Sequence, residues 1–402
     1  MLNNKEYIQR LYQSDKPLII YKTEKGFNIY TDFKEKIVIN KHNLKAFLNY
    51  TTKLKQSNDN DLNCYVGFFG YKLLCENIKV YAPKQKTNNL YPGVFYRPQT
   101  IIKLEKNIKI KSLLKNYKEI RNNKVNNFFY KNNFSVNVNL QQYSKLFNKF
   151  SKKIKEGKTY QIKICQTYRN KSNVNAIDFF WKLMKINESP ESFLIRDKDY
   201  SIISCSPETL INKKNNSIIT KPIAGTLRKR KKMNKKYALN FFKKNEKESK
   251  EHNMIVDMER NDLSKICLTG TVKISKLKQV EEFRDLYHYI TTIKGKVKPN
   301  ISNHDIISAL MPGGSVIGCP KISTLNLLNE SEKFERNIYT GSFGIIHSNG
   351  NMRFNVIIRS ILSYNNISEI SAASGIILGS TAKKEYAENF IKAKSLLDLF
   401  KS

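Results

Sequence analysis

The chain has 402 residues, and 71 Lys and Arg against 34 Asp and Glu give it a formal net charge of +37. No apolar run approaches the roughly 20 residues needed to span a bilayer, and the opening residues, MLNNKEYIQRLYQ, lack the apolar stretch of a secretory signal. We therefore expect a cytoplasmic protein that crosses no membrane. The six cysteines are scattered without a CxxC pair, which predicts reduced thiols and neither a zinc site nor a disulfide framework.

The positive charge suggests a nucleic-acid partner, because clustered Lys and Arg release counterions from phosphates. The excess is instead spread along the whole chain, and the densest runs, LRKRKKMNKK (227–236) and FFKKNEKESK (241–250), lack the interleaved aromatic residues that stack bases. We therefore expect no nucleic-acid partner and keep a basic nucleic-acid-binding protein as a remote alternative. Attraction of an anionic small substrate is the milder consequence.

The predicted elements change character near residue 140. Residues 1–135 alternate polar turns with strand-like stretches, among them PLIIYKT, FNIYTDF, KIVIN and YVGFFGYKLL. The run YSKLFNKFSKKIKEG predicts a helix that ends at Gly157, and the strand TYQIKICQTY follows it. The rest of the chain consists mainly of long hairpins with few helices between them, which predicts an α+β fold built on antiparallel sheets.

Two of the predicted helices carry paired carboxylates. In the closing helix Glu385, Glu388 and Lys392 stand at i, i+3 and i+7, so they project from one face. Glu248 and Glu251 have the same i, i+3 spacing in the helical segment KESKEHNMIVD. Together the two pairs could hold one Mg²⁺, which prefers a few carboxylates plus substrate oxygens. The alternative is ordinary solvated helix surface.

The strand TYQIKICQTY has one polar face, because side chains alternate along a strand. Gln161 on this face could orient a nucleophile, but it has no basic group with which to deprotonate one. Lys163 lies about 7 Å further along the same face, and the strand alone predicts an exposed ammonium for it. His288, in LYHYITTI, is either a catalytic residue or a packed, hydrogen-bonded core histidine.

The segment PGGSVIGCPK (312–321) places three glycines and a serine within ten positions. Glycine pairs mark backbone that turns with positive φ or approaches another group closely. The spacing is not that of a phosphate-binding loop, because Lys321 follows Pro320 and precedes Ile322.

Taken together, eight blocks resemble the chorismate-utilising enzymes, which include anthranilate synthase component I, aminodeoxychorismate synthase component I, isochorismate synthases and salicylate synthases. The blocks are SCSPETL, KPIAGT, KEHNMIVDMERNDL, MPGGSVIGCPK, IYTGSFG, GNMRFNVIIRS, SAASGII and KKEYAENFIKA, in the family's order over about residues 140–400. The resemblance implies a two-layer antiparallel β-sandwich flanked by helices, with a chorismate-binding catalytic region at 140–402. Residues 1–135 would be a strand-rich N-terminal region of the same fold, and PGGSVIGCPK a glycine turn that lines the pocket.

The resemblance also implies a role for each matching residue. Glu251 and Glu388 correspond to ligands of Mg²⁺, with Glu248 and Glu385 nearby through water or hydrogen bonds. Glu208, in SPE, matches the general acid that protonates the departing 4-hydroxyl, a role that needs a pKa raised by burial or by a neighbouring carboxylate. The matching substrate contacts are Arg359 and Tyr339 at one carboxylate, Lys392 and the amides of Ala373, Ser374 and Gly375 at the ring carboxylate, and Gly225 and Thr226 at the ring.

Within the family, the resemblance favours an ammonia-using branch, because water-adding members carry a lysine base where this chain has Gln161. PGGS, TTI after His288, and GSFG with GNM resemble the aminodeoxychorismate synthases, and the LLES-type motif of tryptophan-inhibited anthranilate synthases is missing. Ala224 resembles anthranilate synthase instead, since some aminodeoxychorismate synthases carry a lysine there that is proposed to add to the ring. Lys163 could substitute for that lysine. Arg353 and Phe354 replace the family's usual Asp-Thr.

The expected reaction converts chorismate and ammonia to 4-amino-4-deoxychorismate, a step toward p-aminobenzoate and folate. The alternative is anthranilate synthesis for tryptophan, in which ammonia adds at C2 and pyruvate is eliminated. The sequence contains no glutamine-hydrolysing module. The resemblance therefore implies that ammonia comes from a separate glutaminase subunit, in a heterodimer, or from free ammonium.

Overall fold

The computed structural model describes residues 7–8, 10–11, 14–53, 61–80, 90–118, 128–230, 233–283 and 286–401, with only the backbone at positions 226 and 228. The strands are β1 Leu18–Thr23, β2 Gly26–Ile39, β3 Cys64–Phe69, β4 Gly93–Leu104, β5 Ile108–Ser112, β6 Phe129–Tyr130, β7 Ser135–Val136, β8 Gln161–Asn173, β9 Glu191–Arg196, β10 Tyr200–Ser206, β11 Thr209–Lys214, β12 Ser217–Thr220, β13 Ile223–Arg228, β14 Lys273–Glu282, β15 Leu286–Lys296, β16 Gly318–Cys319, β17 Ser342–His347, β18 Met352–Asn355, β19 Ser360–Tyr364 and β20 Ile367–Ile376. The helices are α2 Leu44–Thr52, α3 Tyr71–Asn77, α4 Leu140–Lys155, α5 Ala176–Ile186, α6 Lys235–Lys244, α7 Glu246–Ile266, α8 Asn303–Leu310, α9 Lys321–Asn329 and α10 Ala382–Leu397, with 3₁₀ turns η1 Gly314–Val316 and η2 Asp398–Lys401.

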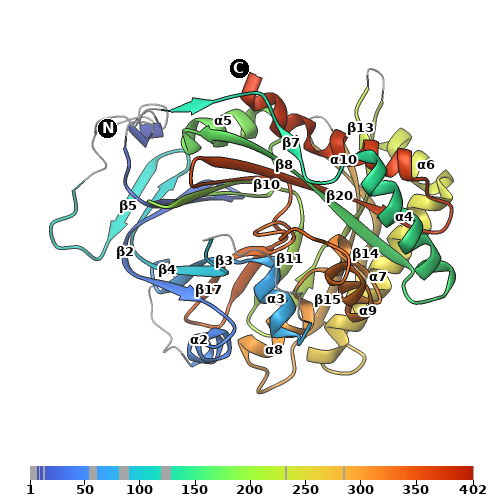
Figure 1. Cartoon of the computed structure of the whole chain (residues 1–402). Helices are drawn as coiled ribbons and strands as arrows, with labels where there is room; N and C mark the ends of the chain where they lie inside the picture. The colour runs from blue at the N-terminus through green and yellow to red at the C-terminus, as the bar shows by residue number, and fades with distance from the viewer. Residues whose placement is uncertain are drawn as a thin grey trace.

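One continuous antiparallel ladder connects most of the strands. It runs β16-β8-β20-β19-β10-β9-β1-β2-β4-β3-β17-β18-β11-β12-β15-β14, and β13 also pairs with β15. The ladder folds over at the long strands β2 and β4, whose register shifts between Phe33 and Glu35. Such a bulge bends a strand, so the same strands can belong to both layers. Figure 1 shows β8, β10 and β20 in one layer and β3, β4 and β17 in the other.

Apolar side chains fill the space between the layers and cover both outer faces. Between the layers, Phe68 and Ile202 are fully buried, and the rings of Phe193 and Phe343 stack with centroids 3.8 Å apart. Helices α5 and α10 pack on the outer face of one layer, and α2, α3, α7, α8 and α9 contribute to the cluster along the other (Figure 1). The predicted two-layer antiparallel α+β sandwich flanked by helices is therefore confirmed.

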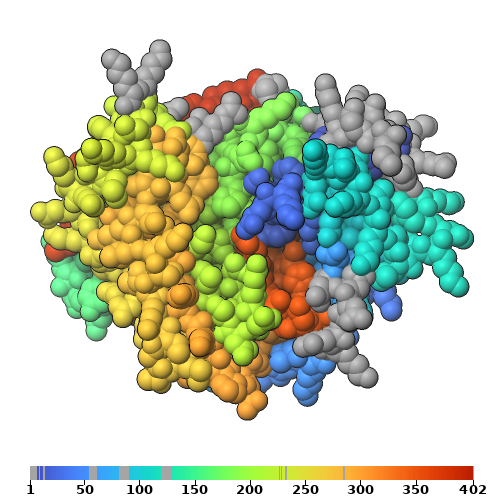
Figure 2. All heavy atoms as spheres, turned by 180° about the vertical axis from the view of Figure 1, so that it is seen from behind, coloured from blue at the N-terminus to red at the C-terminus, as the bar shows by residue number. Residues whose placement is uncertain are grey.

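The N-terminal strands belong to the same body as the later ones. Strand β1 pairs with β9, and β3 pairs with β17, so each layer combines N-terminal strands with strands from beyond residue 140. Figure 2 shows this interleaving on the opposite face, where the blue-to-cyan N-terminal strands lie beside green and red chain, with the yellow-to-orange segment of α6 and β14 beyond. Within the described residues, no helix has the length and apolar character to cross a membrane. All six cysteines are buried free thiols.

Local predictions held where periodicity was long. Helix α4 ends just before Gly157, whose φ of +72° suits glycine, and Asn139 forms a capping box with Gln142 at the start. The expectation that YVGFFGYKLL is strand-like throughout is wrong in its second half, because β3 ends at Phe69 and residues 71–77 form α3. A short apolar run does not distinguish a strand from a buried helix. Tertiary contacts end the strand here, because the amide of Gly70 donates to the carbonyl of Pro92 and that of Tyr71 to the carbonyl of Asn337.

Candidate active site

The site is built around the end of β20 that has a free edge. Strand β20 pairs with β8 as far as Ile376, but with β19 only as far as Ile370. The carbonyl of Ala373 accepts from Nζ of Lys392 at 3.0 Å, so it points away from β8. Peptide groups alternate direction along a strand, so Gly375 points the same way, whereas the amide of Ser374 faces β8. The predicted carboxylate cradle therefore has the amides of Ala373 and Gly375 on its free edge.

Helix α10 is fixed against this edge by polar contacts. The amide of Asn389 donates to Oε1 of Gln166 on β8 at 2.8 Å, and Oγ of Ser374 donates to the carbonyl of Glu385 at 2.9 Å. The hydroxyl of Tyr143, from α4, lies 3.1 Å from the same Oγ. These contacts fix the rotation of α10, so that the face bearing Glu385, Glu388 and Lys392 is turned toward β20.

Helix α7 brings the second carboxylate pair to the same place. The side chain of Asn245 caps the helix by accepting from the amide of Glu248. Lys247, in the first turn, forms an ion pair with Glu385 of α10 at 2.6 Å, which joins the two helices. Glu251 is 8% exposed and Glu385 is 2% exposed. The alternative of solvated helix surface is therefore wrong for these two residues, and the two helices that carry the predicted pairs meet through Lys247 and Glu385.

The acidic cluster of Glu248, Glu251, Glu385 and Glu388 contains charges that shift the pKa values of two of its members. Burial raises the pKa of Glu248 to about 7, helped by the neighbouring carboxylates of Glu251 and Glu388. Burial would also raise the pKa of Glu388, but the ammonium of Lys392, 2.7 Å away, and those of Lys247 and Lys163 outweigh it and lower the pKa. The carboxylates of Glu248, Glu251 and Glu388 repel one another, and a bound cation would relieve that repulsion.

The donor set matches the chemistry of Mg²⁺, which takes carboxylate oxygens and completes its shell with water or substrate oxygens. Repulsion among Glu248, Glu251 and Glu388, and the second carboxylate oxygen of Glu385, which has no hydrogen-bond partner among the described residues, both fit a cation there. In the described part of the chain, no three His, Cys, Asp or Glu side chains lie close enough together to hold a metal ion, so a cation here would take oxygens from water or substrate as well.

Lys163 lies inside this cluster. Its Nζ is 3.3 Å from Oε1 of Glu251, and its side chain is only 12% exposed. The prediction that Lys163 has an exposed ammonium is therefore wrong. Its position follows from β8, where Lys163 shares the polar face with Gln161 and lies opposite Gly375.

Gln161 is fully buried, and neither its side-chain oxygen nor its nitrogen has a hydrogen-bond partner among the described residues. It faces Gly375: a Cβ at that position would stand 2.5 Å from Nε2 of Gln161 and 3.0 Å from Oε1 of Glu251. Only glycine therefore fits at 375. Buried amides are nearly always hydrogen-bonded, so an unpartnered one beside a cluster of charges points to a ligand.

Glu208 follows β10 and is 3% exposed. Burial raises its pKa to about 7, although the hydroxyl of Ser315, which donates to Oε1, and the charge of Lys163 oppose the shift. A general acid at this position needs a carboxyl whose pKa is raised toward neutrality by burial. Glu208 meets that requirement. Its role as the acid stays a prediction.

Ser315 was not among the predicted site residues, although the sequence held a signal for it. It belongs to the segment PGGSVIGCPK, which forms η1 and β16 and pairs with β8 through Gly318 and Cys319. A Cβ at Gly318, where φ is +129°, would lie 2.0 Å from the carbonyl of Gln161. The glycine turn thus lets the serine and the strand approach the pocket closely. Lys247 was also not predicted. The sequence pattern identified its neighbour Glu248, which stands at the i, i+3 spacing from Glu251, but it gave no signal for the lysine beside it.

The predicted anion-binding residues gather beside Ala373. Tyr339 packs with Ala373 and Cys165, and burial raises its pKa while Arg336 and Arg359 oppose the shift. Arg359 has a φ of +53°, unusual for a side chain with a Cβ, and its guanidinium donates to the carbonyl of Lys392 at 3.1 Å. Backbone strain of this kind persists where the surroundings fix a functional side chain. Burial also lowers the pKa of Arg359, which stays charged at any physiological pH.

His288 and the ring-contacting pair lie on neighbouring strands. His288 of β15 pairs in register with Thr226 of β13, whose side chain is outside the described part of the structure. Burial and the charge of Arg359 lower the pKa of His288 to about 3, so its imidazole is neutral and a weak base. Gly225 has a φ of +103°, and a Cβ there would meet Phe242 at 2.9 Å and Glu248 at 3.0 Å. The catalytic assignment of His288 stays a prediction.

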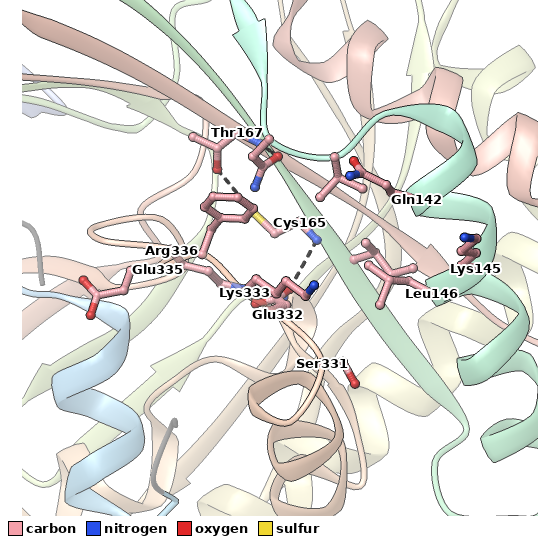
Figure 3. Close-up of a pocket in the computed structure, with 14 residues that line it drawn as sticks. Gln142, Lys145, Leu146, Cys165, Thr167, Ser331, Glu332, Lys333, Glu335 and Arg336 are labelled. Carbon is pink, nitrogen blue, oxygen red and sulfur yellow. Dashed lines mark hydrogen bonds and ion pairs between the residues drawn. The ribbon is translucent and has the colours of Figure 1, made fainter. Parts of the chain in front are cut away.

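A separate cavity of about 360 Å³ lies between α4, β8 and residues 331–336. In Figure 3, Gln142 and Lys145 approach it from α4, and Cys165 and Thr167 from β8. The amide of Cys165 donates to Glu332, and Arg336 donates to the carbonyl of Lys163, so this segment covers the free edge of β8. No residue predicted for the active site lines this cavity.

The chain belongs to the chorismate binding enzyme family, which it matches over residues 6–398. Among curated relatives, it is 32% identical over 252 residues to aminodeoxychorismate synthase component 1 of Bacillus subtilis, covering 62% of this chain and 54% of that protein. It is 33% identical over 268 residues to an anthranilate synthase component I-like protein of Synechocystis, covering 66% and 55%. Anthranilate synthase component 1 of Saccharolobus solfataricus is 31% identical over 264 residues, covering 65% and 63%.

The chain thus spans between half and two thirds of the length of these relatives. Among solved structures, anthranilate synthase component I from Streptococcus pneumoniae has a TM-score of 0.74 at 23% identity, covering 96% of this chain and 91% of that chain. The menaquinone-specific isochorismate synthase of Escherichia coli has a TM-score of 0.76 at 17% identity, covering 97% and 91%. These two likenesses show the fold.

Proposed function

We propose that this chain is the chorismate-aminating component of an aminodeoxychorismate synthase, which makes 4-amino-4-deoxychorismate from chorismate and ammonia. The observation that carries the proposal is the unpartnered, fully buried amide of Gln161 in the candidate site. An amide can orient a nucleophile but cannot take a proton from water, so ammonia suits it better than water does. An aminodeoxychorismate synthase component is among the curated relatives at about the same identity as the anthranilate synthase components, so the choice of branch rests on Gln161.

The substrate is a dicarboxylate, and the site offers it cationic and amide groups. Arg359 and Tyr339 would hold one carboxylate, and Lys392 with the free-edge amides of Ala373 and Gly375 the other. Arg359 presents a planar fork that matches a carboxylate in two places. Glu251 and Glu388 would hold Mg²⁺, which when bound neutralises negative charge on the substrate.

The chain's own groups then account for the proton balance. With a pKa near 7, Glu208 is substantially protonated at neutral pH and can donate its proton to the departing 4-hydroxyl, which leaves as water. Gln161 orients the ammonia, which forms the new C–N bond and loses one proton to solvent, and Glu208 takes one proton back from solvent. Chorismate and ammonia therefore give aminodeoxychorismate and water, with the pyruvyl side chain retained.

Anthranilate synthesis is the second candidate, and Ala224 favours it. Ala224 is 4% exposed, and its carbonyl lies 3.2 Å from Nδ1 of His252, so this position offers no amine for addition to the ring. Curated relatives of the anthranilate synthase type are similar to the chain to the same degree. In that reaction the same residues would serve, but ammonia would add at C2 and pyruvate would leave.

The proposed setting is the cytoplasm, with ammonia supplied by a separate glutaminase subunit. Purified protein is incubated with chorismate, Mg²⁺ and ammonium, and the product is identified by mass and fluorescence. Aminodeoxychorismate supports the proposal, and anthranilate supports the second candidate. Isochorismate or salicylate would overturn the argument from Gln161. Chorismate left unconsumed, with salt-sensitive nucleic-acid binding that persists when Glu251 and Glu388 are changed to Ala, would favour the remote nucleic-acid-binding alternative.

A further inference from the structure

Lys163 places a fixed positive charge within the proposed metal site. Its Nζ lies 3.3 Å from Oε1 of Glu251, and the two side chains are 12% and 11% exposed. Because both groups are largely removed from water, their attraction is screened far less than that of a surface pair. The pair also joins elements far apart in sequence, since Lys163 is on β8 and Glu251 on α7.

The charge of Lys163 extends beyond its direct partner. It is one of the ammonium groups that lower the pKa of Glu388 against the effect of burial. It also opposes the burial that raises the pKa of Glu208. Lys163 therefore lies within electrostatic reach of both proposed metal ligands and of the proposed acid.

The other lysines of the site differ from Lys163 in their access to solvent. Lys247, paired with Glu385, has a side chain that is 35% exposed, and Lys392, paired with Glu388, one that is 26% exposed. A long side chain at the rim can turn its ammonium to water when its carboxylate takes another partner. Lys163 is the third residue of β8 and only 12% of its side chain is exposed, so its charge stays in the site whichever partner it has.

We propose that Lys163 is a resident counter-cation that competes with the divalent metal for Glu251 and keeps the metal affinity of the free protein low. The inference rests on the proposed function, because that assigns Mg²⁺ to Glu251. A metal that binds Glu251 must displace the ammonium and then remain beside its charge. An opposite charge within 4–6 Å changes the proton affinity of a carboxylate by about ten- to a thousandfold, and the same competition should change metal affinity by at least tenfold.

The test measures metal binding directly. Mn²⁺, as a spectroscopic probe for Mg²⁺, is titrated into the full-length protein without chorismate, and bound metal is followed by electron paramagnetic resonance and calorimetry. The dissociation constant is expected to fall at least tenfold in Lys163→Gln and in a second neutral variant, Lys163→Met. Lys163→Arg, which retains the charge, should stay near wild type. So should Lys250→Gln, which removes a 71% exposed lysine from α7.

Folding of each variant is checked by circular dichroism and thermal unfolding. Wild-type affinity in both neutral variants, an equal gain in Lys250→Gln, or no metal binding by any variant would overturn the proposal. Failure of the proposed function appears separately, as absent chorismate consumption by the wild-type protein with Mg²⁺ and ammonium. That result would refute the reaction while the affinity difference between Lys163→Gln and wild type still supports the counter-cation.

Discussion

Replacing Ser315 with Ala should move the alkaline limb of the pH–rate profile upward. The hydroxyl of Ser315 donates to Oε1 of Glu208 and lowers a pKa that burial has raised to about 7. A hydrogen bond to an ionised group is worth about 1.5–3 kcal/mol and one to a neutral group about 1 kcal/mol, so its loss disfavours the carboxylate by about 1 kcal/mol more. Since one pKa unit is about 1.36 kcal/mol, the pKa of Glu208 should rise by roughly 0.5–1.5 units.

The sign follows from the proposed role of Glu208 as an acid, because activity would then need its protonated form and fall as the pH rises through its pKa. The assay measures kcat/KM for chorismate from pH 5.5 to 9 at constant free ammonia, so that titration of ammonium does not shape the profile. Ser323→Ala is the control, because Ser323 donates to the carbonyl of Lys158 on the surface nearby. A limb that stays in place in Ser315→Ala, or moves to lower pH, would refute the assignment of Glu208.

Three further predictions concern the same site and its surroundings. Glu388→Gln should abolish Mg²⁺-dependent turnover while thermal unfolding stays unchanged; retained turnover would remove Glu388 from the metal. Gln161→Met should stabilise the protein by about 1 kcal/mol in urea unfolding, because it removes an unpaired buried amide, and should still lower ammonium-dependent turnover at least tenfold. Burial and the charge of Asp262 raise the pKa of Glu259 to about 8, so its stabilising contribution is lost as pH rises from about 4.5 to 8. Glu259→Gln should therefore gain about 5 kcal/mol of stability at pH 9 and about 1 kcal/mol at pH 5, and equal gains would contradict this.

Helical and strand periodicity made one part of the site predictable. The i, i+3 spacing of Glu248 with Glu251, and of Glu385 with Glu388, depends only on helix geometry, and both helices form where expected. Alternation along β8 likewise gave the polar face that carries Gln161. These features are local, so they follow from the sequence without knowledge of the fold.

The contacts that tune the site were not predictable in this way. Lys163 meets Glu251 across 88 positions, and Ser315 meets Glu208 across 107. Such pairs depend on how the antiparallel ladder closes, which no local pattern encodes. Lys163 shows the consequence: on a strand considered alone, an exposed ammonium is the ordinary expectation, and only the approach of α7 removes it from water.

The resemblance supplied what periodicity could not, namely which residues share a pocket. It predicted that Arg359, Tyr339 and Ala373 lie close together, and the structure does place them side by side. It could not resolve the backbone: whether the amide of Ser374 is available depends on the pairing of β20 with β8, which a motif does not specify. Motif matching therefore predicts the membership of a site better than its hydrogen bonding.

The lysine-rich composition bears directly on how this acidic site can fold without a metal. Burying an unpaired carboxylate carries a penalty of several kcal/mol, and two carboxylates of the site, Glu251 and Glu385, are buried. Lys163, Lys247 and Lys392 each pair with one glutamate of the cluster, at 3.3, 2.6 and 2.7 Å. The ammonium groups thus provide the compensation that a divalent ion would otherwise supply. Under the proposed metal assignment, each of these ion pairs also opposes metal binding, and the proposal expects the strongest effect at Lys163, the least exposed of the three.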